Sequence, residues 1–201
     1  GVAGLALAQA VQRARDGEAG GGQETGCETG GSGCAHVVLT DIDQDAVRRV
    51  TRNAGVNNLA CVRAMKLAWG RRESEDLLRQ FQSRILGESP QGIAMAAALV
   101  FAADVVYDEG GFHSLVESLA ALSSPDSHVF LGYRQRTAKS TAAHFFHLLD
   151  QEFDTPQVVS KAELHPNYAA KDIVVYRLQK RTSQKPLQCQ YCHMLCRDTR
   201  S

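Results

Sequence analysis

The stretch V-F-A-A-D-V-V-Y, Val100 to Tyr107, decides the fold class of this chain. It closes an unbroken apolar run from Ile93 to Ala103 and then turns acidic at Asp104. Such a run is too short to span a bilayer and is typical of a strand buried inside a sheet. We therefore expect a central strand over Met95 to Tyr107, covered on both faces, that ends in a carboxylate and an aromatic hydroxyl.

Strands and helices alternate along the rest of the chain. Apolar periodicity predicts strands at 36–41, 60–70 and 128–136, and helices at 2–15, 42–55, 72–86, 111–122 and 140–153. A closing, hairpin-like pair of strands is predicted at 156–164 and 172–180. This order predicts an α/β fold with a mostly parallel sheet. Such sheets bind ligands at the carboxyl ends of their strands, where Asp41, Trp69 and Asp104 are expected.

The bulk composition narrows the range of partners. The 201 residues are 44% hydrophobic, which suits one domain with a conventional core, and 22 basic residues balance 22 acidic ones. This balance gives no field that would concentrate nucleic acid or a membrane surface, so neither partner is expected. With no visible signal peptide and no disulfide framework, we expect a reducing compartment, the cytoplasm and also the nucleus.

Two segments have unusual composition. Residues 16–35 are dense in glycine and are expected to form a flexible insertion, because the segment lacks the G-K-[ST] ending of a phosphate-binding loop. Residues 183–201 form a tail, expected to be disordered, with zinc-like spacing in Cys189-x-x-Cys192-His193-x-x-Cys196. Closed zinc sites usually draw their ligands from two separated knuckles, so we expect reduced thiols and no metal site.

Asp41 and Trp69 each allow two interpretations. An acid at a strand end can hold the ribose hydroxyls of a nucleotide-like cofactor, but it can equally cap the next helix. The single tryptophan could stack on a purine, although taken alone a core tryptophan is the more common case. The order T-D-I-D also suggests a haloacid-dehalogenase phosphatase with Asp41 as nucleophile, which stays the runner-up because A-A-D-V-V-Y lacks that family's G-D-x-x-x-D strand end.

Taken together, V-V-L-T-D, L-A-W-G and A-D-V-V-Y resemble the seven-β-strand protein-lysine methyltransferases of methyltransferase family 16, the methyltransferase-like 21 group. That family's hallmark is D-x-x-Y at the end of the fourth strand. The resemblance covers 1–182, and its C-terminal half is most similar to the branch acting on valosin-containing protein, a hexameric AAA ATPase. It implies a Rossmann-like class I methyltransferase domain over 1–182, a doubly wound sheet with an antiparallel C-terminal strand pair.

The resemblance also implies a role for each matching residue. Asp41 would hold the ribose of S-adenosylmethionine, and Trp69 would lie against its adenine. The backbone of Ala103 would line the same pocket. Asp104 and Tyr107 would face the target lysine, on a protein substrate such as an AAA ATPase or another chaperone or translation protein.

The sequence departs from the family at three places. The family begins with a strand and an E-L-G-x-G-x-G motif, of which Gly1 matches the second glycine and Ala3 stands at the third. The first strand is therefore expected to be missing, which keeps open an inactive, truncated methyltransferase-like domain. Arg134 stands where the nearest relatives look acidic, and residues 16–35 have no counterpart.

Overall fold

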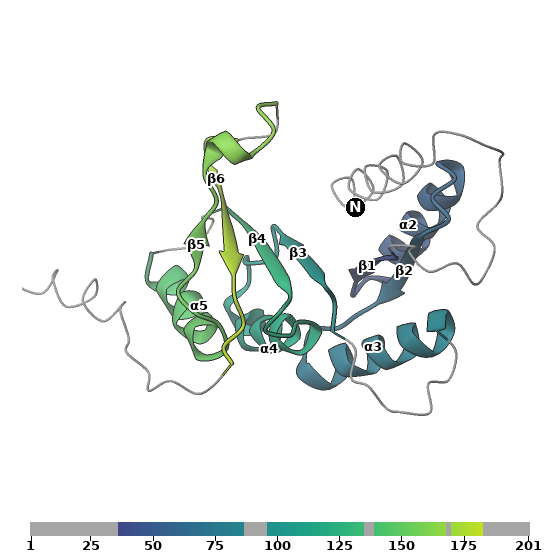
Figure 1. Cartoon of the computed structure of the whole chain (residues 1–201), viewed down its shortest axis with the longest axis horizontal. Coiled ribbons are helices and arrows are strands. Elements are labelled where there is room, and N and C mark those ends of the chain that lie inside the picture. The colour runs from purple at the N-terminus through teal and green to yellow at the C-terminus, as the bar shows by residue number, and fades with distance from the viewer. Residues whose placement is uncertain (1–35, 87–95, 135–138, 168–169, 183–201) are drawn as a thin grey trace, which may run out of the picture. The chain divides into compact units, whose positions relative to one another are not determined.

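The structure is a computed structural model of the chain, and it describes residues 36–86, 96–134, 139–167 and 170–182. The chain divides into two compact units, Gly1–Ala68 and Trp69–Ser201. Within the described residues, the first unit holds a two-stranded sheet and the second a four-stranded sheet (Figure 1). Gly1, the glycine-rich insertion and the cysteine-containing tail lie outside the described residues.

The first unit is a parallel strand pair joined by a helix. Strand β1 (Val37–Asp41) leads through helix α2 (Gln44–Val56) to strand β2 (Val62–Lys66). The two strands run parallel, with Asp41 level with Lys66 at their carboxyl ends. The predicted β-α-β order is therefore confirmed here, although β2 is shorter than the predicted strand and ends before Trp69.

Helix α2 shows how local chemistry sets the boundaries of an element. Asp43 is the N-cap of this helix, and its side chain accepts a hydrogen bond from the backbone amide of Asp45 at 2.9 Å. The helix continues past Gly55 and ends at Val56, so the stop predicted at Gly55 was one residue early. The left-handed turn that follows falls on Asn58, with φ 53°, a conformation that asparagine tolerates better than most residues.

The second unit is built on the strand order β3-β4-β6-β5. Strands β3 and β4 are parallel, whereas β6 is antiparallel to both β4 and β5, as expected for the closing strand pair. Figure 1 shows these strands fanned beside the helices of the same unit. The elements are α3 (Arg71–Leu86), β3 (Leu99–Ala103), η1 (Glu109–Gly111), α4 (Phe112–Leu122), β4 (His128–Arg134), α5 (Lys139–Glu152), β5 (Gln157–Val158), η2 (Lys161–Glu163) and β6 (Ile173–Leu178).

The core of the second unit lies between its sheet and the helices α4 and α5. Alternate residues of β3 and β4 pack against apolar residues of both helices. Each helix thus turns one apolar face toward the sheet. The residues of this core are Val100, Ala102, Val106, Phe112, Leu115, Val116, Leu119, Ala120, Val129, Leu131, Tyr133, Phe145, Phe146, Leu149, Phe153 and Leu178.

The central strand is shorter than the apolar run predicted. Strand β3 spans Leu99–Ala103 and not the whole of 95–107. It ends where it does because Asp104 adopts φ 59°, which an L residue cannot combine with extended strand geometry. The β-branched residues that follow Asp104 therefore belong to a loop.

The expectation that both faces of this strand are covered was wrong for the described part of the chain. Val100 and Ala102 are buried, whereas Leu99 is 45% exposed and Phe101 is 51% exposed. Phe101 stacks on Phe130 of β4, with ring centroids 5.4 Å apart. The second face is thus apolar but accessible, because the core forms only on the side of α4 and α5.

Two further features complete the fold. The closing strand pair is less hairpin-like than predicted, because β5 has two residues and η2 lies between it and β6. Among the described helices, none combines the length and apolar character needed to cross a membrane.

Candidate active site

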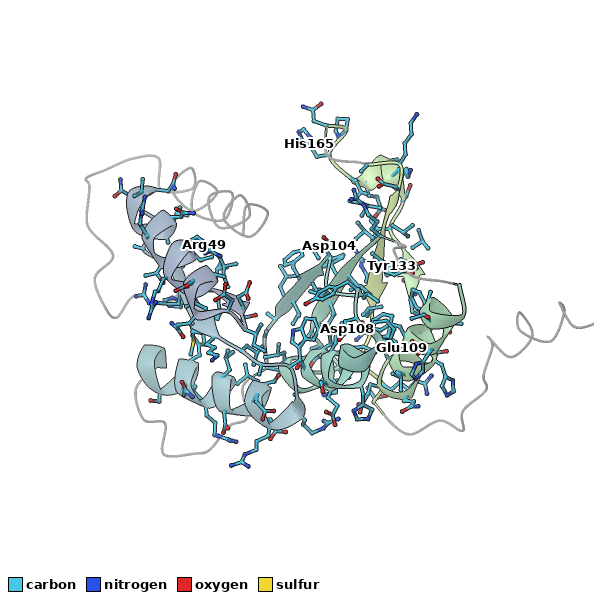
Figure 2. All side chains as sticks on the ribbon, turned by 180° about the vertical axis from the view of Figure 1, so that it is seen from behind. Arg49, Asp104, Asp108, Glu109, Tyr133 and His165 are labelled. Carbon is cyan, nitrogen blue, oxygen red and sulfur yellow. The ribbon has the colours of Figure 1, made fainter. Side chains whose placement is uncertain are left out.

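Asp104 stands at the carboxyl end of β3, where it turns the chain out of the sheet (Figure 2). Its φ of 59° is uncommon for a residue with a side chain. Its backbone amide donates a hydrogen bond to the carbonyl of Gly132 at 3.1 Å, so the sheet still holds the residue after the strand has ended. Strained backbone of this kind is concentrated at functional sites. The sheet therefore holds in place the backbone that carries this exposed carboxylate.

Trp69 and Tyr107 lie side by side at the same end of the second unit. Their ring centroids are 6.2 Å apart, and the rings are tilted by 55°. Trp69 is half-buried and packs against the main core, whereas Tyr107 is 57% exposed. One ring is therefore anchored, and the other is available to a ligand.

The loop before α4 is shaped to receive the indole. A Cβ atom added to Gly111 would lie 3.2 Å from Cζ3 of Trp69 and 3.4 Å from its Cε3. The backbone of Gly111 has φ −92°, so conformational freedom is not what the position needs. The requirement is the absence of a side chain, because the indole occupies that space.

Asp41 lies at the carboxyl end of β1 in the first unit. Its carboxylate is exposed, and its Oδ1 accepts a hydrogen bond from the backbone amide of Asp43 at 2.9 Å. Its carbonyl accepts a second bond, from the amide of Leu67 at 3.0 Å. Asp41 thus braces the loop into α2, while Asp43 is the cap itself. A shallow hollow of about 490 Å³ in this unit lies at the opposite end, around the start of β2.

Ala103 is the last residue of β3 and pairs with Gly132. The acidic side chains of Asp108 and Glu109, which follow Tyr107, are exposed (Figure 2). Oε1 of Glu109 lies 2.9 Å from Nδ1 of His144. Within the second unit the structure thus brings Trp69 next to the D-V-V-Y segment.

Arg134, the departure from the family pattern, has a local partner. Its Nε lies 2.9 Å from Oδ2 of Asp172, which precedes β6. Both side chains are substantially exposed, and such surface pairs contribute little to stability. The pair links the end of β4 to the start of β6.

In the residues that the structure describes, no group of three or more histidine, cysteine or acidic side chains is arranged to hold a metal ion. The cluster of Cys189, Cys192, His193 and Cys196 lies outside those residues. The expectation for these thiols therefore stays a prediction.

Comparison with known proteins decides the family. The family model described as "Lysine methyltransferase" matches residues 21–152, well over half of the chain. The chain belongs to this lysine methyltransferase family. The family predicted from the sequence is thereby confirmed, whereas the similarity to the branch acting on valosin-containing protein stays a prediction.

A curated relative agrees with this membership over part of its length. The protein N-lysine methyltransferase METTL21A of Mus musculus is 33% identical over 89 residues, which cover 44% of this chain and 37% of the relative. The match thus spans little more than a third of that lysine methyltransferase.

Solved structures with a similar arrangement are distant in sequence. A TehB-like SAM-dependent methyltransferase from Corynebacterium glutamicum has a TM-score of 0.46 at 12% identity, covering 73% of this chain and 68% of that one. The Methanococcus jannaschii fibrillarin pre-rRNA processing protein has a TM-score of 0.44 at 9% identity, covering 72% of this chain and 56% of that one.

Two residues that contact the segment Trp69–Gly70 could not be found from the sequence. In the sequence Gly111 looks like an ordinary loop glycine. Its place in a Gly-Gly pair is the one hint that another group packs closely against its backbone. Ser118 interrupts the apolar face of α4, but its hydrogen-bond partner, the backbone amide of Gly70, is 48 residues away in the sequence.

Proposed function

We propose that this protein is an S-adenosylmethionine-dependent protein-lysine methyltransferase whose reaction takes place beside Asp104 and Tyr107. The observation that carries the proposal is the pairing of Trp69 with Tyr107, next to a strand that Asp104 ends in a left-handed conformation. The family supports the reaction class, and this geometry supports the choice of residues made from the family resemblance. Membership in the family favours methyl transfer over the phosphatase alternative.

The residues present suit the cofactor chemically. The indole of Trp69 is half-buried with Gly111 against it, so it offers a rigid aromatic platform for adenine. The exposed carboxylate of Asp41 suits ribose hydroxyls. In the second unit, the proposal assigns the backbone of Ala103, together with Trp69, to the adenine. Gly1 is assigned to the cofactor by the family resemblance. When bound, S-adenosylmethionine supplies an electrophilic methyl group on a sulfonium.

The protein must also supply a neutral amine. A free lysine has a pKa near 10.4, so neutralising it near pH 7.4 costs about 4 kcal/mol. The carboxylate of Asp104 orients the amine and accepts its proton through water. Because Asp104 is fixed by the sheet through its amide, it can do this without reorganising.

Tyr107 contributes an aromatic face rather than a proton. Its ring is 57% exposed and lies beside Trp69. An aromatic face attracts a methylated ammonium by a cation–π interaction. This attraction would retain the lysine while successive methyl groups are added.

The substrate in this proposal is a lysine of a folded protein in the cytoplasm or nucleus. The similarity of the C-terminal half to the branch acting on valosin-containing protein favours an AAA ATPase. The balanced charge of the chain agrees with a protein substrate in preference to nucleic acid.

The test is a methyl-transfer assay with tritiated S-adenosylmethionine and purified valosin-containing protein. We expect label on one lysine, located by mass spectrometry, and no label with Asp104→Ala. If that variant is folded and retains normal turnover, the role of Asp104 is wrong. If the wild type labels no protein in a cell extract, the proposed function is wrong.

A further inference from the structure

Ser118 is a serine buried in the apolar face of α4, and the site as derived above does not use it. It is 2% exposed. Its Oγ accepts a hydrogen bond from the backbone amide of Gly70 at 2.7 Å and donates one to the carbonyl of the same residue at 3.3 Å. A single hydroxyl thus holds both polar groups of one peptide position, 48 residues away.

The backbone of Gly70 is held in an uncommon conformation. It is buried and adopts φ 149°, which side-chain-bearing residues rarely adopt, and a Cβ there would collide with the side chain of Glu73. Its carbonyl also accepts the amide of Ser74 at 3.1 Å, as α3 begins. A buried amide without a partner is strongly disfavoured, so Ser118 is what allows Gly70 to be buried in this conformation.

Trp69 directly precedes Gly70, and its indole sits against Gly111 at the start of α4. Helix α4 and its N-cap residue therefore contact this segment at two points, through the hydroxyl of Ser118 and through the backbone of Gly111. The indole also packs on the core to which α4 contributes. Its position is thus set by α4, although Trp69 follows a different strand.

We propose that Ser118 is a positioning residue for the cofactor: by clamping the backbone of Gly70 it fixes the indole of Trp69 as the platform for adenine. This inference rests on the proposed function, which assigns Trp69 to adenine. Ser118 touches neither the cofactor nor the lysine in this scheme and acts through Gly70 alone.

The chain offers a matched control for this role. Ser123 is also buried, at 3% exposure, and follows the last residue of α4. Its Oγ donates to the carbonyl of Leu119 at 2.7 Å, within the same helical segment. Ser123→Ala removes a buried hydroxyl without touching the segment that carries Trp69.

Trp69 is the only tryptophan of the chain, so its fluorescence reports this position directly. The experiment compares wild type, Ser118→Ala and Ser123→Ala by acrylamide quenching without ligand and by titration with S-adenosylmethionine. We expect Ser118→Ala to increase quenching and to weaken cofactor binding about tenfold, raising the KM for the cofactor more than it lowers kcat. Ser123→Ala should match the wild type in both measurements. Circular dichroism confirms that each variant is folded.

Ser118→Cys keeps a weaker donor and acceptor at the same place and should give an intermediate affinity. The inference is overturned if folded Ser118→Ala shows wild-type quenching and wild-type affinity, or if Ser123→Ala loses affinity equally. If S-adenosylmethionine changes neither the tryptophan emission nor the calorimetric signal of the wild-type protein, the proposed function is overturned, and this inference with it.

Discussion

The α-carbon of Gly111 lies so close to the indole of Trp69 that a Cβ there would be 3.2 Å from Cζ3. This contact joins the segment after β2 to the start of α4, and both belong to the second unit. Because the tryptophan is half-buried on the core, it cannot easily retreat. The absence of a side chain at Gly111 therefore determines how closely the indole of Trp69 approaches the start of α4.

Gly111→Ala should displace the indole and weaken the binding of S-adenosylmethionine. Overpacking by one methyl group costs about 1–3 kcal/mol, so we expect a fall in affinity of about tenfold, measured by calorimetry. Gly110→Ala is the control, because its Cβ would meet only Asp108 Oδ2 at an ordinary 3.5 Å. Equal affinity of the two variants would show that the contact does not matter.

Asp104 should show a conflict between stability and activity. Its φ of 59° favours glycine, so Asp104→Gly should raise the free energy of unfolding by up to about 1 kcal/mol while abolishing methyl transfer. Asp104→Asn tolerates the same backbone but lacks the charge, and it should be inactive at nearly unchanged stability. Urea denaturation and a methyl-transfer assay measure the two effects.

The matched control for this series is Asp108→Asn. Asp108 is an exposed carboxylate in the same loop, and its side chain makes no capping hydrogen bond to η1. Turnover should stay near the wild-type value. A loss of turnover as large as that of Asp104→Asn would mean that the total negative charge of the loop matters, and not the carboxylate of Asp104 in particular.

Lys180 should stabilise the end of α4. Its Nζ donates to the carbonyls of Ala120 at 2.6 Å and Ser123 at 2.9 Å, where the helix leaves its last carbonyls unpaired. Lys180→Met keeps the aliphatic stem and should lower the free energy of unfolding by about 1–2 kcal/mol in urea at pH 7. Lys171→Met, at an exposed position, should change it little; a similar loss there would argue against the capping role.

Asp150 should make stability depend on pH. Burial raises the pKa of its carboxyl from the ordinary 3.8, and Arg181 and His147 partly oppose this. Because the folded pKa is raised, the group favours folding below pH 3.8, and that contribution is lost as the pH rises through the folded pKa.

Asp150→Asn should therefore raise Tm at pH 7, and the gain should shrink as the pH falls toward 4. Thermal melts followed by circular dichroism across this range measure the effect. Asp126→Asn, in the exposed turn before β4, provides the comparison. A gain at Asp150→Asn that is the same at every pH would contradict the explanation by burial.

The strands and helices were predictable where one face is strongly apolar or a cap is present. Asp43 indicates where α2 begins, and the spacing of Phe112, Leu115 and Leu119 predicts the helix α4. The end of β3 was not predictable, because the residues after Asp104 are β-branched and favour a strand. A left-handed backbone at an aspartate leaves no trace in an apolar pattern.

The candidate site was predictable only as residue types at strand ends. The family resemblance singled out Asp104, Tyr107 and Trp69, and the structure puts the rings of Tyr107 and Trp69 next to each other. Ser118 and Gly111 act through contacts between segments distant in the chain. Such contacts depend on packing, which periodicity along one segment does not encode.

The central claim is that this chain holds S-adenosylmethionine against Trp69. The direct measurement is a titration of S-adenosylmethionine followed by Trp69 fluorescence and calorimetry, with Trp69→Phe as the calorimetric control. This titration should be made on the protein of residues 1–201 and on the same protein extended by any residues that its gene encodes before Gly1. We expect saturable binding that changes the tryptophan emission and is weakened by Trp69→Phe. Absence of binding to both folded forms would contradict the account.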